Sequence, residues 1–204
     1  MYPSSFVPKV LAVLLVLVAA VPAGAAEVEP RVLVERFQGN LLAVMKEAES
    51  LGVKGRYDRL VSSIEETFYL PLMIRIASGP YWKGANQTQR SRLISAFRRM
   101  SVSRVATLFD GYAGETFEAI GEKPGPQNTL LVETRIVIPD KPSVNLTYVA
   151  KTINERWRLI DVIVDDGISE LSVRRSEYRR VLQKEGVDGL IAILNKKADE
   201  LIAQ

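Results

Sequence analysis

The feature that most constrains the fold is a region between residues 115 and 164, where short apolar runs alternate with turn-forming residues. In the second run, Val132, Thr134 and Ile136 would share one face of a strand, because successive side chains of a strand point to opposite faces. Pro, Gly, Asn and Asp separate the runs, so consecutive strands should pair as an antiparallel meander. We predict four strands, over 115–123, 130–138, 144–152 and 157–164.

Helical periodicity fills the chain on both sides of this region. Before it, apolar residues recur every three to four positions over 30–50, 57–68 and 72–77, and the stretch 52–55, with a glycine at each end, is expected to end the first helix. Asn86 followed by Gln89 has the pattern of a capping box, which predicts a long helix reaching about Tyr112.

Two further helices are expected after the strands, one containing Leu171 and Leu182 and the other over 188–203. A four-stranded antiparallel sheet with helices on one side makes an α+β domain. The helical N-terminal half and the two C-terminal helices would cover the same sheet.

The first 26 residues have the three-part pattern of a cleavable secretory signal peptide. A short lead with a single Lys precedes an unbroken apolar run over 10–21, and small residues follow it. That run is well short of the ~20 apolar residues that span a bilayer, which argues against a membrane anchor. We expect cleavage after Ala25 or Ala26, export to the periplasm, and one domain over 27–204.

The chain contains no His and no Cys, and this removes much catalytic and metal-binding chemistry. A Ser-His-Asp triad, a thiol nucleophile and a thiolate metal site are all impossible. Gly-rich phosphate loops and the Gly-x-Ser-x-Gly motif are absent as well. The formal net charge of +3 is too small to suggest nucleic-acid binding. We predict no catalytic residue, no cofactor and no metal site.

One acidic residue, Asp161, interrupts the apolar run 159–164. A carboxylate that faces inward there needs a partner. The favoured interpretation is an edge position or a structural bond to a nearby backbone group or Arg. The alternative is a polar anchor at a pocket mouth, or a general base, which would need a tyrosine such as Tyr112, Tyr148 or Tyr178 within reach.

The strongest cluster of positive charge lies in the first helix after the strands. Leu171, Tyr178 and Leu182 form its apolar side, so its cationic side chains are expected to project outward. Such a face can dock onto an acidic partner or onto anionic lipid headgroups, where each basic residue adds up to ~1 kcal/mol. It can equally be an ordinary solvated face. The residues are Arg174, Arg175, Arg179, Arg180 and Lys184.

Several short motifs recur in a fixed order along the chain. They are Tyr81-Trp82-Lys83, Gln89-Arg90, the run from Trp157 through Asp161-Val162 to Gly167-x-Ser169, and Gly186-x-Asp188-Gly189-Leu190. Together they resemble the MlaC family of periplasmic phospholipid-binding proteins, also known as the toluene-tolerance family. The amino-acid sequence of residues 168–178 is similar to that of a branch of the family associated with hopanoid biosynthesis.

The resemblance implies a curved sheet covered by helices, like the cone of nuclear-transport-factor proteins, around an apolar cavity for acyl tails. It also implies a monomeric carrier that shuttles a phospholipid or hopanoid-type lipid between the inner and outer membranes and meets membrane complexes only transiently. We expect a cavity of several hundred Å³. Its lining is expected to come from a set of apolar residues, each of which could also be plain core: Phe109, Tyr112, Val132, Ile136, Ile138, Val144, Leu146, Tyr148, Leu171 and Tyr178.

Two other functions stay open at this point. An envelope adaptor that binds no lipid would dock through the basic helix and would have a filled interior. An enzyme would use the cone-shaped cleft, with Asp161 as its base and a tyrosine as its proton donor.

Overall fold

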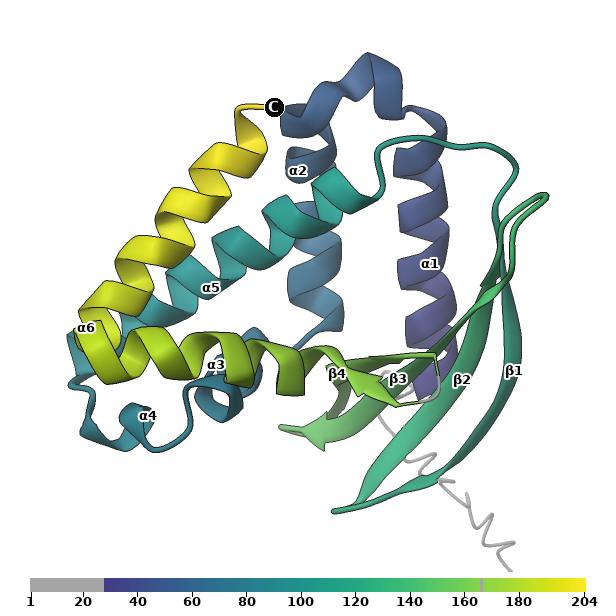
Figure 1. The fold of residues 1–204 in the computed structure, drawn as a ribbon. Helices are drawn as coiled ribbons and strands as arrows, with labels where there is room; N and C mark the ends of the chain where they lie inside the picture. The colour runs from purple at the N-terminus through teal and green to yellow at the C-terminus, as the bar shows by residue number, and fades with distance from the viewer. Residues whose placement is uncertain (1–27, 166) are drawn as a thin grey trace, which may run out of the picture.

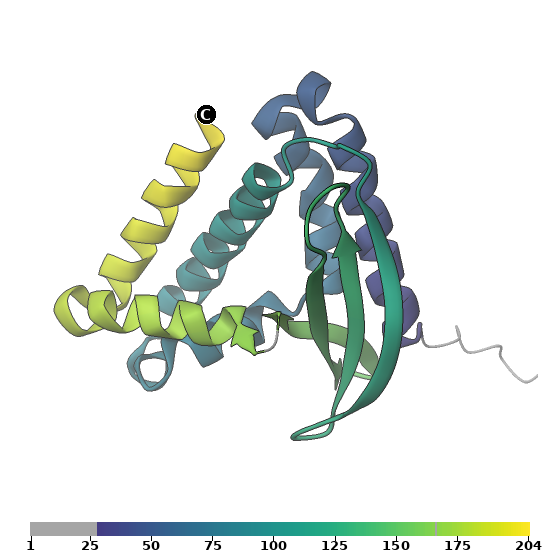
Figure 2. The ribbon, with the colours of Figure 1, turned by 45° about the vertical axis from the view of Figure 1, so that its right-hand side comes forward.

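The computed structural model describes residues 28–165 and 167–204, in which helices gather on one side of a curved sheet (Figure 1, Figure 2). The predicted signal peptide, residues 1–26, lies outside the described residues. The elements are α1 (Pro30–Lys46), α2 (Ala48–Thr67), α3 (Leu70–Ser78), α4 (Tyr81–Gly84), α5 (Gln87–Leu108), β1 (Thr116–Gly125), β2 (Thr129–Val137), β3 (Val144–Ile153), β4 (Arg156–Val164), β5 (Ile168–Ser169) and α6 (Glu170–Ile202).

The sheet is an antiparallel meander in the order β1-β2-β3-β4-β5. This confirms the α+β fold class and the four predicted strands. The fifth strand is a correction: Ile168 and Ser169 pair with the end of β4, in a segment too short to show any alternation. The register shifts after Ala119 in β1 and between Val149 and Ala150 in β3, and such bulges bend a sheet.

Helix α5 begins where the sequence predicts. The Asn86 side chain accepts a hydrogen bond from the Gln89 backbone N–H at 2.8 Å, and the Gln89 side chain accepts one from the Asn86 N–H at 3.1 Å. The predicted capping box is therefore confirmed. The helix ends at Leu108 instead of about Tyr112, because Phe109 leaves helical geometry.

The first predicted helix, over 30–50, is divided. Helix α1 ends at Lys46, and Gly52 (φ 56°) then interrupts the helical geometry near the start of α2. Gly55 does not end a helix as expected but lies within α2, where helical geometry resumes after the kink.

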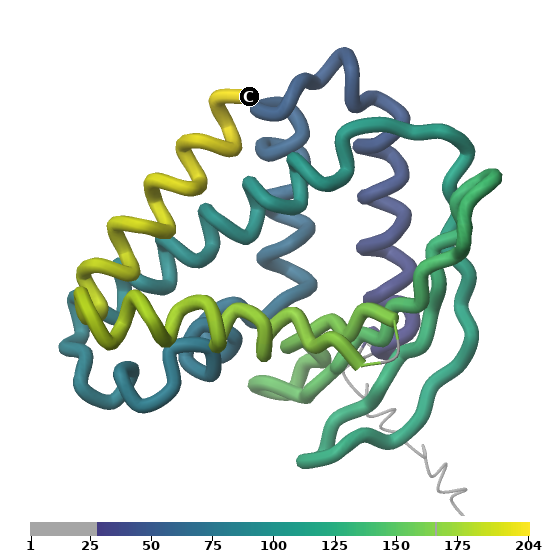
Figure 3. The backbone as a smooth tube through the Cα atoms, viewed as in Figure 1, coloured from purple at the N-terminus to yellow at the C-terminus, as the bar shows by residue number. Residues whose placement is uncertain are grey.

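Helix α6 consists of two arms that meet at Gly186, as the tube in Figure 3 shows. The first arm leaves the end of the sheet, and the second runs alongside α5 (Figure 1). These arms correspond to the two predicted C-terminal helices, now joined through one glycine. Gly186 has φ 65° and ψ −163°, a conformation that is almost confined to glycine. A Cβ on Gly189 would overlap the Cβ of Glu185. The kink therefore requires a second glycine, about one turn after Gly186.

The apolar core lies between the inner face of the sheet and the helices. Some of its side chains have no exposed surface at all, among them Val34 of α1, Leu60 of α2, Ile74 of α3, Leu93 of α5 and Leu159 of β4. Over the described residues, every helix is too short or too polar to cross a bilayer.

We predict that Gly186→Ala lowers the free energy of unfolding by about 1–3 kcal/mol, because a Cβ is strained at this φ and ψ. Gly39→Ala is the matched control. Gly39 lies inside α1 with open space around its Cα, and there alanine should stabilise the helix by about 0.5–1 kcal/mol. Denaturant unfolding followed by circular dichroism measures both. Equal stability of Gly186→Ala and wild type would contradict the role of glycine in the kink.

Candidate functional site

A cavity of about 250 Å³ lies between the sheet and the helices. Strands β3 and β4 supply one wall, α5 and the first arm of α6 supply the other, and α1, α2 and α3 contribute from the side. The lining residues are Phe37, Leu41, Ile64, Phe68, Leu70, Met73, Phe97, Met100, Ser101, Arg104, Val105, Leu108, Phe109, Leu146, Tyr148, Val162, Val164, Glu170, Leu171, Arg174 and Tyr178.

Most of this lining is aliphatic, aromatic or methionine. The Phe37 ring packs edge-on against Phe68, with ring centroids 5.1 Å apart. Apart from two tyrosines, the polar lining residues are Ser101, Arg104, Glu170 and Arg174, all from α5 and α6. Both Arg104 and Leu108 are exposed, so the cavity opens to solvent beside the C-terminal half of α5. The interior is suited to an apolar chain, and the charges lie on the helical wall.

The structure brings half of the predicted lining residues to the cavity. These are Phe109, Leu146, Tyr148, Leu171 and Tyr178.

The other five predicted residues lie elsewhere in this structure. Val132 and Ile136 of β2 are buried but do not border the cavity, because β2 packs against α1. Ile138 and Val144 are half-buried at the β2–β3 turn. Tyr112 is 42 % exposed, and Lys46 lies 5.3 Å from the centre of its ring.

Sequence reasoning missed most of the helical wall. Phe37 and Leu41 of α1 and Phe97 of α5 stand on apolar helix faces that the periodicity reveals. Periodicity marks such a face as buried but does not tell whether it meets another side chain or a cavity. The signal that could have singled them out is their size, since aromatic and methionine side chains concentrate on these faces.

A buried polar trio lies beside the cavity. The Gln38 amide donates to the Thr134 hydroxyl at 2.9 Å and to the Tyr148 hydroxyl at 3.3 Å, and Thr134 donates to the Leu146 carbonyl at 3.2 Å. Burial raises the pKa of Tyr148 to about 12, and the hydrogen bond from Gln38 opposes that rise. These bonds fix the Tyr148 ring between α1 and the cavity.

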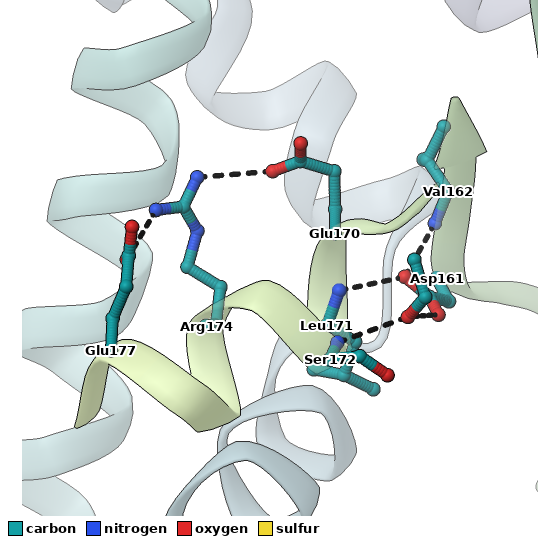
Figure 4. Close-up of polar contacts among 8 residues, drawn as sticks. Asp161, Val162, Glu170, Leu171, Ser172, Arg174 and Glu177 are labelled. Carbon is teal, nitrogen blue, oxygen red and sulfur yellow. Dashed lines mark hydrogen bonds and ion pairs between the residues drawn. The ribbon is translucent and has the colours of Figure 1, made fainter. Parts of the chain in front are cut away.

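Arg174 is held between two carboxylates (Figure 4). It donates to Glu177 at 2.7 Å and to Glu170 at 3.0 Å, and only 12 % of its side chain is exposed. The expectation that it projects outward with the other cations is therefore wrong, because its position on α6 turns it toward the cavity. Arg175, Arg179, Arg180 and Lys184 are exposed as expected.

Asp161 joins β4 to the start of α6 (Figure 4). Its carboxylate accepts hydrogen bonds from the Ser169 hydroxyl at 2.6 Å, the Leu171 N–H at 3.0 Å and the Val162 N–H at 2.8 Å. This confirms the structural interpretation of Asp161. Among the described residues, no tyrosine hydroxyl hydrogen-bonds to this carboxylate, so the arrangement required for a general base is not formed.

These features define an α+β protein with an apolar binding cavity. The family model described as MlaC protein matches residues 35–196, so the chain belongs to the MlaC protein family. The fold is similar to a solved structure of the phospholipid-binding protein from Ralstonia solanacearum in complex with a phospholipid, with a TM-score of 0.75 and 16 % sequence identity. The match covers 86 % of this chain and 99 % of that one.

The raised pKa of Tyr148 predicts a loss of stability at alkaline pH. The folded value, about 12, lies above the unfolded value of about 10, so the contribution is fully present below pH 10 and disappears as the pH rises through 12. Over this window Tyr148 should remove on the order of 2 kcal/mol from the free energy of unfolding. Tyr148→Phe should flatten the fall, measured by denaturant titration at several pH values. A wild-type slope in Tyr148→Phe would contradict the prediction.

Proposed function

We propose that this protein is a periplasmic carrier that holds the acyl tails of a phospholipid in the cavity and shuttles the lipid between the inner and outer membranes. The observation that carries the proposal is the cavity itself, which is apolar inside and charged only on its α5 and α6 wall. Two findings support it: the chain belongs to the MlaC family, which is periplasmic, and it shares its fold with a protein solved in complex with a phospholipid.

The physical problem that such a carrier addresses is the exposure of acyl chains to water. Each CH₂ group left in water costs about 0.8 kcal/mol, so a lipid with two long tails does not cross an aqueous compartment alone at a useful rate. A protein that encloses the tails removes this barrier without any bond being made or broken. The absence of His and Cys from the chain is compatible with that task.

The size of the cavity adds a requirement. At about 250 Å³ it falls below the range of about 300–1,000 Å³ that drug-sized ligands occupy, and a double-chain lipid is larger still. The walls must therefore separate when a lipid enters. Met73 of α3 and Met100 of α5 line the cavity, and unbranched methionine side chains adapt readily to a changed shape.

We assign the tails first to the residues that already border the cavity, including Leu146, Tyr148, Leu171, Tyr178 and Phe109. Widening of the cavity toward β2 would bring the remaining predicted residues into contact with the lipid. These residues are Val132, Ile136, Ile138, Val144 and Tyr112. A hopanoid-type cargo stays a prediction. The proposal also includes removal of residues 1–26 and a monomeric domain over 27–204.

Leu146→Asp tests the cavity. Leu146 is half-buried and lines the cavity, so we expect the variant to fold and to carry little lipid when it is purified from the periplasm. Val132→Asp is the matched control on the neighbouring strand. Val132 is 1 % exposed and does not border the cavity, and an unpaired carboxylate there should unfold the protein.

Circular dichroism reports folding in this test, and mass spectrometry of the extracted lipid reports loading and cargo identity. A folded Leu146→Asp variant with the wild-type lipid content would remove Leu146 from the site. A wild-type protein from which no lipid can be extracted would contradict the proposed function.

The exposed cations of α6 are the proposed docking surface for membranes or membrane complexes. Arg175, Arg179, Arg180 and Lys184 form no ion pair with another described residue, whereas Arg174 forms two. Transient partners need fast association more than tight binding, and surface charge raises association rates in a way that salt screens. This makes the first arm of α6 a wall of the cavity on one side and a docking face on the other.

Reversal of Arg175 and Arg179 to Glu should slow lipid transfer to acceptor membranes or partner complexes at low salt, with unchanged lipid content and melting temperature. The double reversal of Arg36 on α1 and Lys197 near the end of α6 changes the net charge equally and is the control, since both residues are exposed and neither is paired with a described residue. Wild-type transfer rates for the α6 variant would show that this helix is an ordinary solvated face.

A further inference from the structure

The opening of the cavity holds one arginine that forms no ion pair with any described residue. Arg104 of α5 and Arg174 of α6 both line the cavity. Arg174 pairs with both Glu170 and Glu177, and the first of these pairs also occupies the Glu170 carboxylate, which lines the cavity. Arg104 is exposed and forms no ion pair with any described residue. The guanidinium at the opening that no described carboxylate occupies is therefore that of Arg104.

Tyr178 contributes a hydroxyl donor to the same wall. Its side chain lines the cavity and is 6 % exposed, and its hydroxyl makes no hydrogen bond within the described part of the chain. Burial raises the pKa of Tyr178, an effect opposed by the positive charges of Arg174 and Arg104 and reinforced by Glu177. The phenol stays protonated at neutral pH, so its O–H is available to an acceptor.

We propose that the Arg104 guanidinium and the Tyr178 hydroxyl bind the phosphate of the lipid, and that this contact selects phosphate-bearing lipids over neutral lipids with the same acyl chains. The proposal rests on the proposed carrier function. A guanidinium is the side chain best matched to phosphate, because its N–H groups form a planar fork and its charge is permanent. The phenol O–H of Tyr178, a residue that is only 6 % exposed, strengthens the same contact, since few water molecules compete for it.

The geometry also explains why Arg174 does not take this role. Its guanidinium is bound on both sides by carboxylates at 2.7 and 3.0 Å, and a phosphate would have to displace one of them. Arg174 is therefore engaged by carboxylates of its own helix and leaves the phosphate to Arg104 of α5.

The test compares two lipids that differ in the phosphate alone. The delipidated protein is equilibrated with detergent micelles containing equal amounts of dioleoyl phosphatidic acid and dioleoylglycerol, and the bound lipids are extracted and quantified by mass spectrometry. We expect the wild type to take up phosphatidic acid over dioleoylglycerol by about tenfold, which corresponds to 1.4 kcal/mol. Arg104→Gln should bring this ratio close to one, and Tyr178→Phe should lower it severalfold.

Dioleoylglycerol uptake should fall much less than phosphatidic acid uptake in Arg104→Gln, because dioleoylglycerol carries no phosphate for Arg104 to bind. Arg36→Gln, which removes an exposed positive charge from α1, should keep the wild-type ratio and thus separates direct contact from net charge. A wild type that binds both lipids equally overturns the phosphate site and leaves the carrier function standing. A wild-type ratio in Arg104→Gln overturns the assignment of the site. Binding of neither lipid overturns the proposed function itself, and the phosphate site with it.

Discussion

The cavity depends on the hydrogen bonds that Asp161 accepts at the junction of the sheet and α6. The carboxylate receives the Ser169 hydroxyl and the Leu171 N–H, so the first turn of α6 is tied to the middle of β4. A carboxylate at this end of a helix is also favoured by the helix dipole. Because these bonds set the direction of the first arm, they determine where Leu171, Arg174 and Tyr178 face. The acidic residue that looked anomalous inside an apolar strand thus positions one wall of the cavity.

The two arms of α6 have different roles, since one packs in the core and the other borders the cavity. The second arm buries Leu190, Ile191 and Leu194 and packs on α5, whereas the first arm faces the cavity. Side chains that border a cavity lose the dispersion contacts that neighbours would supply. With no cysteine in the chain, no disulfide can offset that loss, so the filled part of the core must stabilise the fold. Gly186 allows one helix to serve both regions, because it turns the second arm so that this arm runs alongside α5.

The sequence predicted what depends on local periodicity and on local hydrogen bonding. The alternation in β2 and the capping box at Asn86 each involve residues close together in the chain, and both are confirmed. Arg174 was misplaced although Glu170 and Glu177 lie within about one turn of it, because the apolar periodicity assigned all cations of this helix to one outer face, whereas Arg174 borders the cavity. The helical wall of the cavity escaped prediction for a different reason. A side chain borders a cavity when no other side chain fills the space opposite it in the folded protein. Apolar periodicity shows that a residue is buried, but it does not show whether that space is filled.

The motifs that revealed the family explain why its cargo is harder to read than its fold. Most of them meet at one corner, far along the helices from the sheet. The Gln89 amide donates to Asp188 at 2.7 Å, and the Arg90 guanidinium lies 5.6 Å from the centre of the Trp82 ring and donates to the Trp82 carbonyl at 3.1 Å. These contacts join α4, α5 and the second arm of α6 just beyond the kink at Gly186, and none of these residues borders the cavity. They hold the arm in position and lie outside the cavity, so they belong to the fold and not to the cavity lining. The residues that would distinguish one lipid from another line the cavity instead. Most of that lining is apolar, and aliphatic, aromatic and methionine side chains can all meet this requirement.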